Sequence, residues 1–161
     1  MNLISNGSFE VNTTGWTAAN SALAVDAGEY KVGAKSCKVT SSAAGDWGLA
    51  HYNAVTGTPV SRRAYTAACW VKGEGAAVGR TIRLTLRELG GAQSGGIFGL
   101  VDATLTDDWQ RLVVTGTMVE ADRTSVYVLP AARSAVGADE VFYLDDVQLE
   151  EVPSPLRAAI L

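Results

Sequence analysis

Apolar and polar residues alternate along much of the chain. The segment from Thr81 to Arg87 shows this most clearly, because Ile82, Leu84 and Leu86 occupy every second position. A period of two residues is that of a β-strand with one buried face. Segments with this alternation, or rich in β-branched and aromatic residues, lie at 2–5, 21–26, 36–41, 47–54, 65–73, 79–89, 97–105, 109–119, 124–131 and 141–150. The pattern predicts about ten strands and no convincing helix.

Turn residues separate these segments at the spacing of a β-sandwich. Glycine pairs occur at Gly90-Gly91 and Gly95-Gly96, and Gly73-Glu-Gly75 follows another apolar run. A chain of 161 residues falls within the size of a single domain. Two prolines after Val152 prevent a further central strand. We therefore predict an all-β fold, a two-sheet antiparallel β-sandwich over residues 1–151, followed by a proline-containing tail over 152–161.

The last predicted strand changes register in its middle. Phe142 and Leu144 share one parity, whereas Val147 and Leu149 share the other. One extra residue at Asp145-Asp146 would keep all four side chains on the core side, which is a β-bulge. Two carboxylates at such a bulge suggest a site for a hard cation.

Four segments, taken in their order along the chain, resemble the sequence pattern of a known family. They are Asn2-Leu-Ile-Ser-Asn-Gly-Ser-Phe-Glu10 with Gly15-Trp16, Tyr65-Thr-Ala-Ala-Cys-Trp-Val-Lys72, Asp108-Trp-Gln-Arg111, and Phe142-Tyr-Leu-Asp-Asp-Val-Gln-Leu-Glu150. The chain resembles the carbohydrate-binding modules of the family 4/9/22 type over residues 2 to about 150. The resemblance implies a jelly roll that binds glycan without cleaving it and usually holds a structural Ca2+.

The resemblance also implies where that calcium would lie. The N-terminal segment, a glycine-containing loop and the Asp-Asp strand meet in the family. Carried over, the candidates are Ser8 or Glu10, a carbonyl around Gly33 to Lys35, and Asp146, with Asp145 as second choice. The alternative is a hydrogen-bonded bulge without a metal.

Aromatic and basic residues are the candidates for a glycan site, because sugar rings stack on aromatic side chains and arginine donates to their oxygens. Trp70 has the opposite parity to Cys69 and Val71, so we predict that it faces outward. The other candidates are Trp47 and His51, which share one parity, together with Tyr127, Arg83 and Arg87. Both arginines lie opposite a core-facing run, either in a cleft or on a solvated face. Trp16, within the opening signature, is expected in the core.

The two cysteines lie inside strand patterns. Val39 follows Cys37 and Val71 follows Cys69 at a spacing of two residues, so both cysteines are predicted to face the core. They are either two reduced thiols or a disulfide.

Charge and motifs exclude several function classes. The net charge of −4 argues against nucleic acid as a partner. No apolar run approaches the ~20 residues that membrane insertion requires, and no signal peptide opens the chain. His51 is the only histidine, and no Gly-x-Ser-x-Gly motif accompanies it, so we predict no enzyme activity. A hydrolase would need a pair of carboxylates across the cleft.

We therefore predict a carbohydrate-binding β-sandwich that recognises host-surface glycans. Without an export signal in the chain, our prediction places it on the surface of a phage virion, as a tail or decoration protein, in contact with other virion proteins or with itself. The alternatives are an extracellular accessory module of a secreted glycoside hydrolase and a purely structural virion protein.

Overall fold

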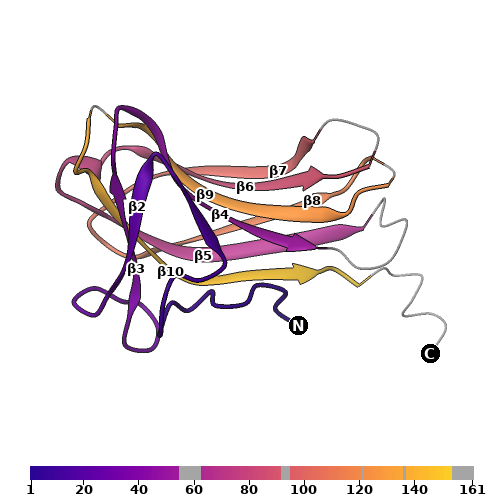
Figure 1. Ribbon diagram of the computed structural model, residues 1–161, viewed down its shortest axis with the longest axis horizontal. Coiled ribbons are helices and arrows are strands. Elements are labelled where there is room, and N and C mark those ends of the chain that lie inside the picture. Colours follow the sequence, from indigo (N-terminus) through magenta and orange to yellow (C-terminus); the bar gives the residue numbers. More distant parts are fainter. Residues whose placement is uncertain (55–62, 92–94, 121, 136, 154–161) are drawn as a thin grey trace.

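The computed structural model is a sandwich of two antiparallel five-stranded sheets. It describes residues 1–54, 63–91, 95–120, 122–135 and 137–153 (Figure 1). Sheet A has the strand order β1-β4-β9-β6-β7, and sheet B has the order β2-β3-β10-β5-β8. The predicted two-sheet fold is confirmed.

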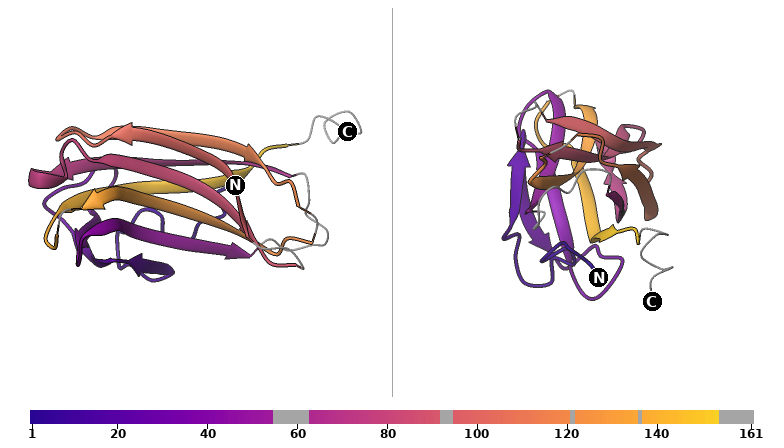
Figure 2. Two further views of the ribbon diagram at one scale, coloured as in Figure 1. Left: turned by 90° about the horizontal axis from the view of Figure 1, so that it is seen from above. Right: turned by 90° about the vertical axis from the view of Figure 1, so that its right-hand side faces the viewer.

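The strands of sheet A are β1 (Trp16–Ala19), β4 (Gly45–Ala54), β9 (Ser125–Ala135), β6 (Thr81–Leu89) and β7 (Gly96–Thr104). Those of sheet B are β2 (Ser21–Asp26), β3 (Ser36–Ser41), β10 (Val141–Glu151), β5 (Ala64–Glu74) and β8 (Gln110–Thr117). A single 3-10 turn, η1 (Gly75–Ala77), follows β5 in the described part of the chain. The long strands run side by side along the sandwich (Figures 1 and 2).

The alternation seen in the sequence sorts side chains between core and surface. On β6, Ile82, Leu84 and Leu86 are each 0% exposed. Inward-facing residues of both sheets meet these side chains in one continuous core. Each large apolar side chain buried in this way contributes about 1.5–3 kcal/mol of transfer free energy.

The predicted bulge is present in β10. The pairing of β10 with β5 changes register between Asp145 and Gln148, and Asp146 has a positive φ of 45°. Because of the bulge, apolar residues on both sides of it are fully buried: Phe142, Leu144, Val147 and Leu149.

The N-terminal segment lies against the same strand. The strand predicted over residues 2–5 is not formed. Asn2 instead contacts β10 through its side chain, whose Oδ1 accepts a hydrogen bond from the Leu149 N–H at 2.9 Å. Gly7 is required here, since a Cβ at this position would lie 2.1 Å from the Val147 carbonyl oxygen. The segment runs beside β10 in Figure 1. The chain's opening residues are thus tied to its last strand.

Strand β1 is not among the predicted segments. Its four residues show no alternation, and only the first of them, Trp16, is buried. Pairing with β4, where Trp16 lies opposite His51, defines it.

The two cysteines are buried free thiols. Cys37 lies on β3 and Cys69 on β5, with β10 between them, which places them about 10 Å apart and beyond disulfide reach. Burial raises the pKa of each thiol to about 12.

We expect neither thiol to react with Ellman's reagent in native buffer, because the thiolate is the reactive form and both sulfurs are inaccessible. Both should react at once in denaturant, as followed by absorbance. Rapid labelling of the folded protein would contradict the inward orientation of β3 or β5.

Candidate functional site

Three candidates for the glycan site, two arginines and one tyrosine, lie on the outer face of sheet A. Arg87 on β6 is paired with Tyr127 on β9 and with Ile97 on β7. Paired residues of antiparallel strands project their side chains on the same face. Four residues earlier, Arg83 has the same parity and is paired with Ala131 and Asp102. The register therefore brings Arg83, Arg87 and Tyr127 together.

Solvent-exposed apolar side chains lie beside these three residues. Ile97 and Leu100 on the edge strand β7 are 56% and 46% exposed. Thr85, between Leu100 and Leu129 in the register, is only 7% exposed although it points outward. This short side chain lies below its longer neighbours. We call this surface the sheet A face, consisting of Arg83, Thr85, Arg87, Ile97, Leu100, Asp102, Tyr127, Leu129 and Ala131.

One end of the sheet A face is electrically neutralised. Arg83 donates Nε and Nη2 to the two carboxylate oxygens of Asp102, each at 2.7 Å. These hydrogen bonds lower the pKa of Asp102 and raise that of Arg83. Beside this pair, Arg133 lies 2.9 Å from Asp46. Arg83 therefore has two of its donors committed within the protein.

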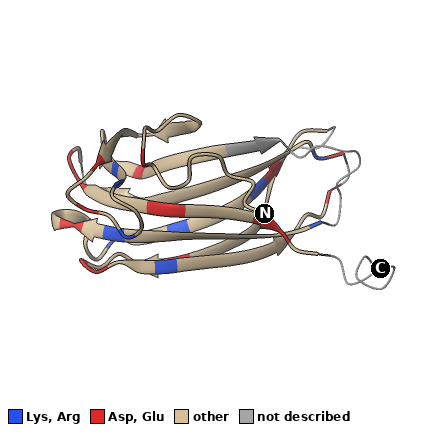
Figure 3. Cartoon of the chain, turned by 90° about the horizontal axis from the view of Figure 1, so that it is seen from below, with Lys and Arg blue, Asp and Glu red and all other residues tan. Residues whose placement is uncertain are grey.

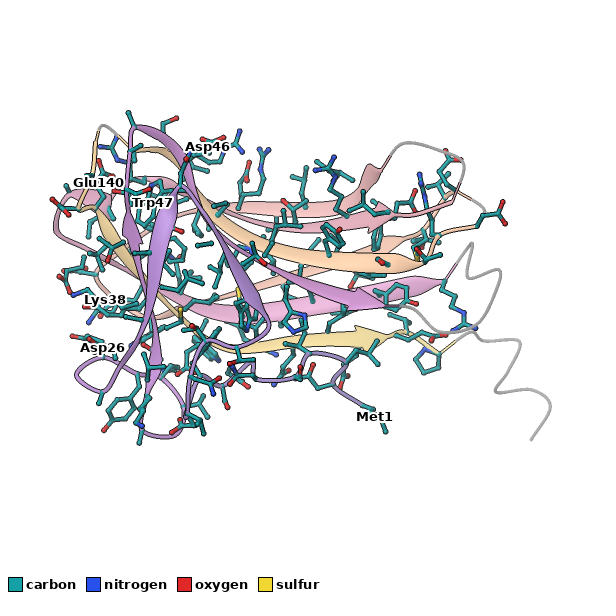
Figure 4. All side chains as sticks on the ribbon, viewed as in Figure 1. Met1, Asp26, Lys38, Asp46, Trp47 and Glu140 are labelled. Atoms are coloured by element: carbon teal, nitrogen blue, oxygen red, sulfur yellow. The ribbon has the colours of Figure 1, made fainter. Side chains whose placement is uncertain are left out.

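Trp47 and His51 do not face outward, and these predictions are wrong. Trp47 is 1% exposed and packs against Phe142 with 4.9 Å between ring centroids (Figure 4). His51 is 5% exposed and meets Trp16 edge-on at 5.0 Å. The shared parity of the two residues was right, but their face of β4 is the core. Leu49, which lies between them with the same parity, is the sequence signal for this assignment.

Trp70 faces outward as predicted, but from the other sheet. It lies on β5, where it is paired with Arg111 of β8 on the outer face of sheet B. The Lys31 ammonium sits over its ring, 4.5 Å from the centroid. Lys72, of the same parity, forms an ion pair with Glu29 at 2.7 Å. Trp70 therefore does not share one groove with Tyr127 and the two arginines.

Sequence reasoning missed Asp102, Ile97 and Leu100. All three lie on β7, which pairs antiparallel with β6, the strand before it in the chain. Arg83 and Asp102 are equally distant in sequence from the middle of the glycine-rich segment between these strands, so a hairpin register was a usable signal.

The segments implied in calcium binding do meet. Glu10 accepts hydrogen bonds on Oε1 from the N–H groups of Ala34 at 2.9 Å and Lys35 at 3.3 Å. Asp145 accepts on Oδ2 from the N–H groups of Lys31 and Val32, each at 2.8 Å. Two carboxylates from opposite ends of the chain thus hold the segment 31–35.

The glycine in that segment is dictated by Glu10. Gly33 has a φ of 72°, and a Cβ there would lie 1.9 Å from Glu10 Oε1. Only glycine combines this backbone conformation with such a close approach.

These carboxylates bond N–H groups rather than forming an oxygen cage. Asp145 is 0% exposed, and its Oδ1 also accepts from the Asp146 N–H at 2.7 Å. Burial raises the pKa of Asp145, and the N–H donors oppose that shift. Both oxygens of Asp146 accept from the Gln148 amide at 3.1 Å, and Ser8 is exposed. Within the described residues, no three His, Cys, Asp or Glu side chains group to hold a metal.

Comparison with protein families decides what kind of domain this is. Residues 1–130 match the family described as carbohydrate binding domain, of the 4/9 type. The chain belongs to this carbohydrate-binding domain family. No curated protein matches the chain.

Solved structures show the same fold as this carbohydrate-binding domain. The CBM22-1 xylan-binding domain of Paenibacillus barcinonensis Xyn10C has a TM-score of 0.70 at 20% identity, covering 92% of this chain and 93% of its own. The Family 16 Carbohydrate Binding Module-2 has a TM-score of 0.66 at 21% identity, covering 93% and 100%. TmCBM61, solved in complex with beta-1,4-galactotriose, has a TM-score of 0.62 at 15% identity, covering 94% and 99%. These likenesses confirm the jelly-roll sandwich.

His51 is buried in this domain, and Asp46 and Asp102 on sheet A are paired with arginines. Burial lowers the pKa of His51. A glycosidase needs one carboxyl group with a raised pKa to act as the acid, whereas that of Asp102 is lowered.

Acidic and basic positions are interspersed along the ribbon (Figure 3). Nucleic acid binding would need a basic surface instead. Within the described residues, no helix has the length and hydropathy to cross a bilayer.

Proposed function

We propose that the domain binds a polysaccharide on the sheet A face, with Tyr127 as the aromatic platform and Arg87 as the main donor. One observation carries the proposal. The strand register places Tyr127, Arg87 and Ile97 in one row across three neighbouring strands, with Arg87 and Ile97 exposed.

The chemistry of this row suits a sugar chain. An aromatic ring offers its face to the apolar C–H surface of a sugar, and the guanidinium beside it donates to hydroxyl oxygens. Short side chains such as Thr85 and Ala131 leave room beside the larger ones. On sheet B, the Lys31 ammonium lies over the Trp70 ring.

Affinity electrophoresis in gels containing xylan or β-1,4-galactan tests the proposal, because one structure of this fold is named a xylan-binding domain and another was solved in complex with beta-1,4-galactotriose. We expect Tyr127→Ala to remove retardation, since the stacking of a nucleic-acid base on an aromatic side chain, a related contact, is worth roughly 1–3 kcal/mol. Trp70→Ala, the matched control on the other sheet, should be retarded like the wild type. Retardation lost in Trp70→Ala and kept in Tyr127→Ala would move the site to sheet B.

The setting of the domain is a separate proposal. A module of the same fold forms part of the CBM22-1-GH10 portion of Clostridium thermocellum Xyn10B, with 93% of this chain covering 28% of that one. This supports the extracellular accessory role beside a glycoside hydrolase more than display on a virion. The virion setting and virion partners stay predictions.

The structural calcium also stays a prediction, resting on the family resemblance. If an ion binds only the native state near Asp146, it should raise the free energy of unfolding by about 2.7 kcal/mol at about 100 times its Kd. Melting curves in millimolar calcium and in EDTA measure this difference. Asp146→Ala should abolish it, whereas Asp107→Ala, in an exposed turn, should not. Superimposable curves for the wild type would contradict the prediction.

A further inference from the structure

Arg87 is the one arginine of the described sheet A face that has no carboxylate partner. Arg83 is paired with Asp102, and Arg133, at the same end, with Asp46. All 17 Asp and Glu residues of the chain lie in its described part, and none of them forms an ion pair with Arg87. The charge of this exposed guanidinium is therefore left open to a ligand.

The neighbouring carboxylates are unable to neutralise it. Glu88 follows Arg87 in sequence but points into the core, where it is 3% exposed and lies 3.6 Å from Arg123. Asp102 belongs to the row of Arg83, four residues away, which is about 13 Å along a strand.

The local charge differs in sign from that of the whole chain. The described outward side chains of sheet A include three arginines, Arg83, Arg87 and Arg133, and two carboxylates, Asp46 and Asp102, which leaves one positive charge. The chain as a whole carries −4. That surplus sits on Arg87, beside Tyr127 and Ile97.

We propose that the polysaccharide bound on the sheet A face is acidic, and that Arg87 pairs with the carboxylate of a uronic-acid unit. This inference rests on the proposed function and names its substrate class. A guanidinium matches a carboxylate with two parallel N–H···O bonds, a geometry that neutral hydroxyls do not offer. The ring of Tyr127 stacks on the sugar while Arg87 reads its charge.

Paired polymers test the inference. The probes are glucuronoxylan, polygalacturonate and alginate, each compared with its carboxyl-reduced form, in which the uronic acids have become neutral sugars. We expect at least one acidic polymer to bind at least tenfold more tightly than its reduced partner, with affinity falling as salt is raised. Arg87→Gln should abolish this preference and Arg87→Lys should weaken it. Arg111→Gln, an exposed arginine on sheet B, is the matched control.

The outcomes separate this inference from the proposed function. If neutral polymers bind through Tyr127 but no acidic polymer exceeds its reduced partner, the acidic ligand is wrong and the sheet A face stands. The inference is also overturned if Arg87→Gln weakens both forms of a polymer equally. If Tyr127→Ala changes no binding at all, the proposed function fails together with it. Melting curves of each variant establish that it is folded.

Discussion

Replacing Trp47 with alanine should lower the free energy of unfolding by about 3–5 kcal/mol. The indole is 1% exposed, packs against Phe142 of the opposite sheet, and belongs to the continuous core. Its removal would leave a cavity between the two layers that rigid strands on both sides are unable to close. Chemical denaturation followed by circular dichroism measures the loss.

Trp70→Ala is the matched control for this substitution. Trp70 is partly exposed and is contacted by the flexible Lys31 side chain, so we expect its loss to cost less than about 1.5 kcal/mol. Equal destabilisation by the two variants would contradict the assignment of Trp47 to the core and Trp70 to the surface.

Arg123→Ala should be about as harmful as Trp47→Ala. Arg123 and Glu88 are 1% and 3% exposed, and Nη1 of Arg123 also donates to the Gly90 carbonyl at 2.8 Å. Truncation would leave the Glu88 carboxylate buried without its counter-charge, which costs about 3–5 kcal/mol. Urea denaturation of the variant gives the loss directly.

The double variant Glu88→Gln with Arg123→Met separates charge from packing. It removes both charges while keeping side chains of similar length, so it should recover part of the lost stability. The exposed Arg111→Ala should stay within about 0.5 kcal/mol of the wild type. A double variant less stable than Arg123→Ala would show that the buried charges are not the cause.

The sequence was sufficient for features that depend on neighbours within one strand. Alternation on β6 identified Ile82, Leu84 and Leu86 as core residues, and the change of parity at Asp145-Asp146 located the bulge. Both predictions follow from the two-residue period of a strand, which is a local property.

Features that depend on pairing between strands far apart in the chain were harder to predict from the sequence. Parity showed that Trp70 points away from the core, but not that β5 belongs to a different sheet from β6 and β9. The pairing of β5 with β10 joins residues such as Trp70 and Asp145, far apart in the chain, and no local pattern encodes it.

The prediction of which face of β4 points outward was wrong for a different reason. Its two faces carry Trp47, Leu49 and His51 on one side and Gly48 and Ala50 on the other, so side-chain size was the informative signal and the polarity of His51 was misleading. In this core the His51 ring packs edge-on against Trp16.

The hydrogen bonds that hold segment 31–35 were not predictable from the sequence either. The resemblance brought Glu10 and the Asp-Asp strand together, but it did not predict that Glu10 and Asp145 each bond two backbone N–H groups of that segment. The direction of a side chain at a bulge depends on backbone angles such as the φ of 45° at Asp146.

The central claim is that the sheet A face is the carbohydrate-binding surface, and a 15N-resolved NMR titration tests it most directly. With xylo-oligosaccharide, β-1,4-galactotriose or an oligogalacturonate as ligand, we predict that amide shifts concentrate on β9, β6 and β7 around Tyr127, Arg87 and Ile97. Amides around Trp70 on β5 and Arg111 on β8 should stay unchanged. Shifts confined to sheet B, or no shifts with any of these ligands at millimolar concentration, would contradict the claim.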